Sequence, residues 1–185
     1  MYYLVNEWSL DDERLRKDLE QIGLPIQSLQ LENILDSIFF NQKVDSPLHM
    51  TSLPLPPFWE VCANGDIVSD GMKRGKIDCF QDRPQRVKKV DWYDPDGHCS
   101  VSDHYDRSGS LFLKEVWSAD ERHLSIYTND RMGKLYLFHQ HDRAIYQAID
   151  GLEQGFSSIE DAKKALLQEA LLQAETVFLS DPELL

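Results

Sequence analysis

Imidazole and carboxyl groups in the central part of the chain are the first candidates for chemistry, because His and Asp are common zinc ligands. His139 and His141 are separated by one residue, a spacing that places both imidazoles on the same face of a strand. His98, Asp103 and His104 lie upstream, but none of them has a dependable ligand spacing to this pair. We therefore expect surface histidines near turns and no bound metal.

Aspartates of the same region could supply the two carboxyl groups that glycoside hydrolysis requires. Asp94, Asp96 and Asp106 fall in segments rich in turn-forming residues, where an aspartate ordinarily accepts hydrogen bonds from the backbone. The sequence contains no G-x-S-x-G, no phosphate-binding P-loop and no G-x-G-x-x-G motif. We expect no catalytic residue and no cofactor, and a small hydrolase or transferase that uses Asp and His is the alternative.

A 12-residue repeat indicates the elements that position these side chains. Residues 93–97, Tyr-Asp-Pro-Asp-Gly, are echoed by residues 105–109, Tyr-Asp-Arg-Ser-Gly, with weaker copies at 117–121 and 129–133. A strand of about seven residues and a turn of four or five, closed by a glycine with positive φ, accounts for this period. The residues expected to shape the turns are Asp94, Gly97, Asp106, Gly109 and Gly133.

Between the turns, residues alternate in the manner of β-strands. Cys99, Val101 and Tyr105 alternate with polar neighbours, which favours an antiparallel β-meander over residues 53–140. Apolar side chains also fall on the second face, so the sheet is expected to need a partner. The residues predicted to bind a partner or an acceptor are Phe112, Val116, Tyr127, Tyr136, Tyr93 and Tyr105.

The segments on either side of the meander indicate helices mixed with strands. Residues 1–52 begin as a strand, and Ser9 has the side chain to cap the helix expected after it. Residues 141–185 are expected to return as helices, the first over residues 144–149, and to end in a short strand. The predicted fold class is α+β, with the meander of residues 53–140 between two flanking segments.

Composition narrows the functional classes. Lys and Arg number 19 against 32 Asp and Glu, and the resulting charge of -13 disfavours nucleic acid as a partner. The three cysteines have no C-x-x-C spacing, which predicts neither a disulfide framework nor a zinc knuckle. The first residues lack the basic and apolar regions of a signal peptide, so a cytoplasmic location is expected.

Three motifs, taken in chain order, carry a family resemblance. They are Leu-Pro-Leu-Pro-Pro-Phe-Trp-Glu-Val at 53–61, Arg-Val-Lys-Lys-Val-Asp-Trp-Tyr-Asp-Pro-Asp-Gly at 86–97, and Val-Ser-Asp-His-Tyr-Asp-Arg-Ser-Gly at 101–109. Together they resemble the N-terminal part of the glycosyltransferase-stabilising subunit of the bacterial accessory Sec system. That family carries an extended β-sheet inserted near the start of a GT-B fold. The resemblance implies that the flanks of the meander belong to a partial Rossmann-like layer.

The same resemblance implies a non-catalytic role. In that family the stabilising subunit pairs with a catalytic subunit that attaches N-acetylglucosamine to serines and threonines of a serine-rich repeat adhesin before export. The implied partners are the catalytic glycosyltransferase subunit and the serine-rich acceptor polypeptide, with self-association through the sheet as a further expectation. The implied location is the cytoplasm, with peripheral membrane association only through the secretion complex.

Two features of the sequence, its length and its aromatic and glycine repeats, affect the function that the resemblance implies. Members of the family continue through both Rossmann-like halves, whereas this sequence ends at Leu185, so a complete donor-sugar cleft is not expected here. Aromatic and glycine repeats also occur in free-standing carbohydrate-binding modules, which form a second alternative. The missing secretion signal argues against that alternative.

Overall fold

The computed structural model describes residues 2–5, 27–30, 34–40, 46–172 and 177–179. The chain divides into two compact units, Met1–Ile38 with Glu160–Leu185, and Phe39–Ile159. These divisions fall after Ile38 and Ile159, whereas the sequence placed them after residues 52 and 140.

The first unit contains a three-stranded parallel sheet. Its strands are β1 (Tyr2–Val5), β2 (Gln27–Gln30) and β13 (Val177–Leu179), in the order β13-β1-β2. Tyr3 pairs with Ser28 on one side and with Phe178 on the other. The expected strands at both ends of the sequence are therefore present and adjacent, while the helix expected after Ser9 lies outside the described residues.

Two described helices flank the sheets in sequence, α2 (Ile34–Phe39) and α3 (Ile159–Leu172). Glu160 and Asp161 occupy the first turn of α3, where acidic side chains favour the positive end of the helix dipole. Ala162 and Leu166 are buried at helical spacing. Among the described residues, no helix is both long and apolar enough to cross a membrane.

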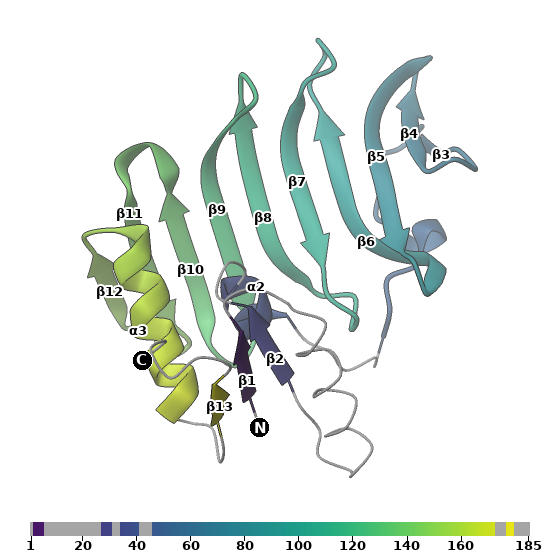
Figure 1. The fold of residues 1–185 in the computed structure, drawn as a ribbon. Coiled ribbons are helices and arrows are strands. Elements are labelled where there is room, and N and C mark those ends of the chain that lie inside the picture. The colour runs from purple at the N-terminus through teal and green to yellow at the C-terminus, as the bar shows by residue number, and fades with distance from the viewer. Residues whose placement is uncertain (1, 6–26, 31–33, 41–45, 173–176, 180–185) are drawn as a thin grey trace. The chain divides into compact units, whose positions relative to one another are not determined.

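The second unit is dominated by a ten-stranded antiparallel sheet (Figure 1). Its strands lie side by side in chain order, so each hairpin connects direct neighbours. The strands are β3 (Glu60–Val61), β4 (Asp66–Ser69), β5 (Met72–Phe80), β6 (Arg83–Tyr93), β7 (Cys99–Tyr105), β8 (Leu111–Ser118), β9 (Glu121–Asn129), β10 (Gly133–Phe138), β11 (Arg143–Ala148) and β12 (Glu153–Phe156).

The sheet extends further along the chain than the predicted meander. Residues 144–149 do not form the expected helix, because β11 pairs with β10 along its whole length and with β12 on its other side. A short 3-10 turn, η2 (His139–His141), connects β10 to β11. The helical return therefore begins only at α3.

Two turns of the sheet share one geometry. The backbone N–H of Gly97 donates to the carbonyl of Asp94, and that of Gly109 donates to Asp106, both at 3.1 Å. Gly97 has φ 90° and Gly109 has φ 84°, so the expected positive φ is confirmed at both glycines. Each aspartate side chain accepts from the backbone two and four residues further on. Asp94 and Asp106 thus shape the turns, as expected of aspartates at this position.

The next two turns take other forms. Ala119 and Asp120 both have positive φ, which is the backbone of a two-residue hairpin turn. Asn129 instead accepts from the backbone of Arg131, and Gly133 has φ 110° at the start of β10. The spacing of these turns is regular, but only the first two have the same hydrogen bonds.

Residues 46–59 run along the sheet before it begins. This stretch, which we call the strap, contains the 3-10 turn η1 (Met50–Ser52) and carries Leu53 into a buried cluster with Ile67, Ile77, Val87 and Val90. The backbone N–H of Val87 donates to the carbonyl of Leu48 at 2.9 Å. The strap therefore covers one face of the sheet at β4 to β6.

Candidate interaction surface

One face of the sheet carries two cross-strand rows of residues between β7 and β12. Directly paired residues point to the same face, so the registers define both rows. The first row is Val101, Val116, Leu124, Phe138 and Arg143, and the second is Asp103, Lys114, Ile126, Tyr136, Ile145 and Gly155. We call this surface the open face, because its apolar members are all partly exposed, Ile145 to 38%.

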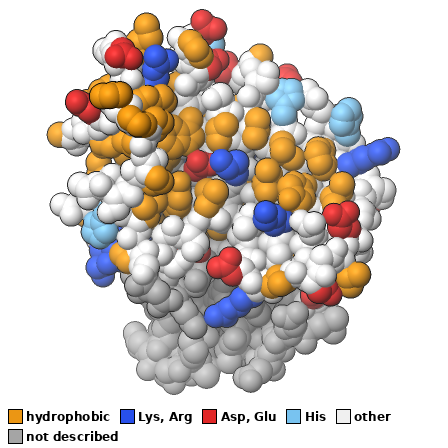
Figure 2. Space-filling view, turned by 180° about the vertical axis from the view of Figure 1, so that it is seen from behind, with side chains coloured by type: hydrophobic (Ala, Val, Ile, Leu, Met, Phe, Trp, Pro, Cys, Tyr) orange, Lys and Arg blue, Asp and Glu red, His pale blue; other side chains and the backbone are white. Residues whose placement is uncertain are grey.

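Figure 2 views the molecule from behind and shows hydrophobic side chains gathered in two groups with charged side chains between them. Ion pairing explains charge within an otherwise apolar row. Lys114 Nζ lies 2.9 Å from a carboxylate oxygen of Asp103, and the Trp92 indole donates to the other oxygen at 2.8 Å. Because one Asp103 oxygen is ion-paired with Lys114 and the other accepts a hydrogen bond from Trp92, the charge can remain buried within this face.

The opposite face is buried along the same strands. Ser102, Glu115 and Ser125 occupy neighbouring strands in one row and are at most 7% exposed. Burial alone would raise the pKa of Glu115, but its hydrogen bonds with His104 and Arg122 outweigh burial and hold the pKa below its ordinary value. This face is therefore a covered layer with an ionised, fully paired carboxylate.

The structure separates the four residues predicted to form one docking surface. Val116 and Tyr136 lie on the open face, but Phe112 and Tyr127 lie on the buried face at 7% and 8% exposure. Phe112 packs edge-on against Phe40 with ring centroids 5.2 Å apart. Phe112 and Tyr127 are therefore core residues, whereas Val116 and Tyr136 remain partly exposed.

Tyr93 and Tyr105, the other two predicted binding residues, lie beside the two similar turns. Lys73 lies over the Tyr93 ring, with its nitrogen 5.4 Å from the centroid. Tyr105 packs against the cluster under the strap, and burial raises its pKa to about 12. Tyr105 thus has a packing role, while Tyr93 is partly exposed near the end of β6.

The histidines considered as metal ligands are engaged separately. His104 contacts Glu115 at 2.9 Å and the His139 ring contacts the Ser125 hydroxyl at 2.8 Å. His98 is exposed near a turn, at 3.9 Å from Asp120. In the part of the chain that the structure describes, no three His, Cys, Asp or Glu residues are grouped to hold a metal ion.

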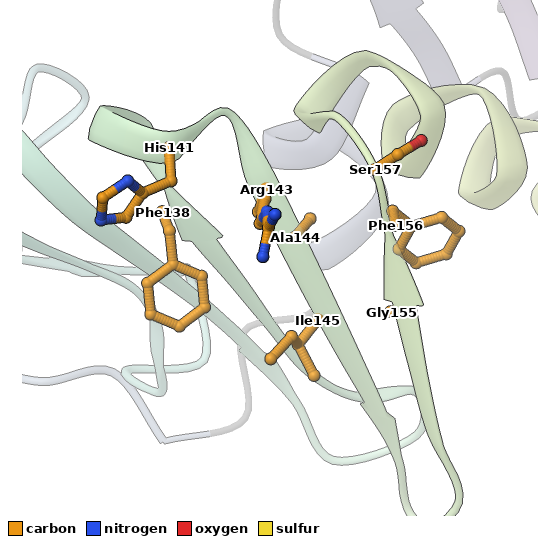
Figure 3. Close-up of a pocket in the computed structure, with 8 residues that line it drawn as sticks. All are labelled: Phe138, His141, Arg143, Ala144, Ile145, Gly155, Phe156 and Ser157. Carbon is orange, nitrogen blue, oxygen red and sulfur yellow. The ribbon is translucent and has the colours of Figure 1, made fainter.

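A hollow of about 730 Å³ opens where β10 and β12 end and β11 begins. Phe138, His141 and Ile145 line it from one side, and Phe156 and Ser157 from β12 and the residue after it (Figure 3). Gly155 also lines the hollow, and a Cβ added at this glycine would meet nothing within 4 Å. The hollow is therefore open and has room for small side chains.

The strand beside this hollow is an edge of the sheet. The backbone N–H of Ala148 donates to the carbonyl of Leu152, which sets the alternation of hydrogen bonds along β11 and β12. By that alternation, the backbone groups of Glu153 and Gly155 point away from β11. An extended polypeptide can pair with such groups.

The sequence alone did not place Leu124, Ile126 and Ile145 on the open face. Alternation alone marks them as apolar, but their shared face follows only from the registers across three hairpins. The spacing of the turns sets the registers of these hairpins, so it is the sequence feature from which the shared face could have been predicted.

An open, chain-ordered antiparallel sheet with one exposed apolar face is typical of a protein that works through association. A family model described as the GtfB middle domain matches residues 59–155, which span β3 to β11 and nearly all of β12. The chain belongs to the GtfB middle-domain family.

Curated relatives agree with this family. Two proteins named UDP-N-acetylglucosamine--peptide N-acetylglucosaminyltransferase stabilizing protein GtfB match the chain. The one from Streptococcus gordonii is 37% identical over 82 residues, covering 42% of this chain and 18% of the relative. The one from Streptococcus parasanguinis is 31% identical over 144 residues, covering 69% of this chain and 32% of the relative. The chain thus spans about a third or less of these relatives.

Solved structures share the fold at low identity. A chain from "Crystal structure of GtfA/B complex bound to UDP and GlcNAc" superposes with a TM-score of 0.74 at 22% identity, covering 98% of this chain and 44% of that chain. A chain of the glycosylation-associated Gap123 complex from Streptococcus agalactiae superposes with a TM-score of 0.72 at 9% identity. The match covers 98% of this chain and 47% of that chain. The arrangement described above is therefore an established fold.

Proposed function

We propose that this chain is a non-catalytic docking part of a protein O-glycosyltransferase complex. The observation that carries the proposal is the partly exposed apolar open face on a member of the GtfB middle-domain family. Relatives are named as stabilising proteins of a peptide N-acetylglucosaminyltransferase, and one structural relative was solved in a complex of GtfA and GtfB. A stabilising protein must cover surface on its partner, and an apolar face does so favourably.

The transferase subunit is the occupant we assign to the open face. Ile126, Tyr136 and Ile145 form a continuous apolar row, with Leu124 and Phe138 in the row beside it. The Asp103–Lys114 pair is already satisfied within the chain, so covering it leaves no unpaired charge. Such a surface supplies an aromatic centre with a polar border, which is the usual composition of a specific interface.

The acceptor polypeptide is assigned to β12 and the hollow beside it. A serine-rich acceptor is extended and has small side chains, which suit an edge strand and an open floor at Gly155. Backbone pairing with Glu153 and Gly155 would hold the acceptor. The chain needs no catalytic group for this role.

The finer organisation belongs to the same proposal. The parallel strands β13, β1 and β2 are consistent with part of a Rossmann-like layer, into which the antiparallel sheet is inserted. The regular turn spacing along β6 to β10 is consistent with a hairpin repeat that lengthens this insert. We place the complex in the cytoplasm, with membrane association only through a secretion complex.

The docking proposal predicts that Tyr136→Asp weakens binding to the cognate GtfA-type transferase by about 30-fold or more, the size of an interface hot spot. Tyr136 is partly exposed, so the variant should fold with an unchanged circular-dichroism spectrum. Isothermal titration calorimetry of the purified chain against the transferase measures the effect.

Gln154→Asp is the matched control, since it adds the same charge at an exposed position on the other side of the sheet. It should bind like the unmodified chain. Equal binding by Tyr136→Asp and by the unmodified chain would remove the open face as the docking site. No binding by the unmodified chain would reject the proposed function.

The acceptor proposal predicts that Gly155→Val weakens binding of a serine-rich acceptor peptide about tenfold. The new side chain enters the hollow, and nothing within 4 Å of its Cβ opposes folding. Fluorescence anisotropy with a labelled peptide measures the change in peptide affinity. Gln154→Val is the control, because it places the same side chain on the opposite side of the strand. Unchanged peptide affinity in Gly155→Val would place the acceptor elsewhere.

A further inference from the structure

Phe58 is the most exposed large hydrophobic side chain among the described residues, at 92%. It also has φ 69°, in the left-handed region that L-residues with a Cβ rarely adopt. Folding therefore gains almost no burial from this ring and keeps its backbone in an unfavourable conformation. A residue that is costly to the free chain in both respects is a candidate for a role in binding.

The local backbone explains how this conformation is held. The backbone N–H of Trp59 donates to the carbonyl of Pro56 at 3.2 Å, which closes a four-residue turn. Pro57 occupies the second position and Phe58 the third, with positive φ, which is the geometry of a type II turn. That third position ordinarily holds Gly or Asn, so the phenyl ring is the exception.

The base of the turn is fixed in the core. Leu53 is buried, and Leu55 and Trp59 pack against the cluster that contains Ile67 and Val90. The Trp59 ring also lies 6.3 Å from the Trp92 ring, centroid to centroid. Phe58 therefore projects from a rigid support, and little conformational freedom remains to be lost when a partner binds it.

The surroundings of Phe58 specify the chemistry of its partner. Residues 46–59 contain no Asp, Glu, Lys or Arg, although 28% of the chain is charged. Pro54, Pro56 and Pro57 are exposed beside the ring. An uncharged, rigid tip that ends in a phenyl ring is complementary to a preformed apolar pocket on a folded protein.

We propose that Phe58 is an anchor that inserts into an apolar pocket of the transferase subunit, which rests on the docking function proposed above. A folded subunit provides such a pocket, whereas an extended serine-rich acceptor does not. The turn immediately precedes β3, the edge of the sheet opposite to β12. The anchor thus lies apart from the acceptor edge and leaves β12 free.

Phe58→Gly tests this role by separating folding from binding. Glycine suits the third position of a type II turn, so the variant should melt at the same or a higher temperature than the unmodified chain. Its Kd for the cognate GtfA-type transferase, from calorimetry, should rise by about 30-fold or more. Loss of affinity together with kept or increased stability is a result that a purely structural Phe58 would not give.

Leu152→Ala is the matched control, because Leu152 is 70% exposed in the turn between β11 and β12. It should bind the transferase like the unmodified chain. If Tyr136→Asp loses affinity while Phe58→Gly keeps it, the anchor is rejected and the docking function stands. If the unmodified chain does not bind the transferase, the anchor and the docking function are both rejected. A change in self-association alone, seen by sedimentation of Phe58→Gly, would assign the ring to a second copy and reject the anchor.

Discussion

Phe112→Asp is expected to abolish the folded state. The ring is 7% exposed and packs on Phe40, so its loss from the core costs about 3–5 kcal/mol. Placing a carboxyl group in the same apolar site adds roughly 1–3 kcal/mol or more. Together these approach the whole stability of a typical domain, about 5–15 kcal/mol. Thermal unfolding followed by circular dichroism should show no cooperative transition.

Tyr136→Asp is the comparison for this result, because the same charge then enters the open face. It should unfold cooperatively within a few degrees of the unmodified chain. A folded Phe112→Asp variant that melts normally would show that the buried and open faces have been assigned the wrong way round.

Alanine at Gly109 is expected to destabilise the chain far more than alanine at Gly97. The two glycines have φ 84° and 90° in turns with the same backbone hydrogen bonds, so the cost of the backbone conformation is nearly equal, at about 1–2 kcal/mol. Their surroundings differ. A Cβ at Gly109 would lie 2.6 Å from both the Leu48 nitrogen and the Ser46 carbonyl oxygen, whereas a Cβ at Gly97 meets nothing within 4 Å.

The clash at Gly109 is with backbone atoms of the strap, which cannot turn aside as a side chain can. We therefore expect Gly109→Ala to cost a further 1–3 kcal/mol, similar to overpacking in a core. Urea unfolding of the two variants measures the difference. Equal free energies of unfolding would show that the strap does not lie against this turn in solution.

The meander was predictable because the residue types in its turns indicate where each turn lies. Asp94 with Gly97, and Asp106 with Gly109, combine a backbone acceptor with a residue that tolerates positive φ. The sequence between them then needs only alternation to form strands. The turn residues and the alternation between them are both local features of the sequence. They can therefore be recognised without knowledge of the rest of the fold.

Strand β11 was not predictable in the same way. Ala144, Ile145, Ala148 and Ile149 have a spacing that also fits one face of a helix. Pairing with β10 and β12 decides between the two structures, and it depends on residues outside the segment. Tertiary pairing therefore overrides the local helical pattern.

The faces were misassigned at Phe112 because of a β-bulge. The register shifts between His104 and Tyr105, so Tyr105 pairs with Leu111 and not with Phe112. Phe112 and Leu113 are consequently both buried, although neighbours in a regular strand point to opposite faces. A bulge arises between two strands, so alternation along either strand alone does not reveal it.

The identity of strand order and chain order has a consequence for assembly. Each strand of the large sheet finds its neighbour through one short turn, so the loop that must close is small at every step. The sheet therefore has a low contact order for a β-protein, and its hairpins can form in succession without long-range search. The strap is the exception, since Leu48 bonds to Val87 and Ser46 lies close to Gly109, both far along the chain. These non-local contacts require the strands to be in place first, which makes docking of the strap the late step in folding.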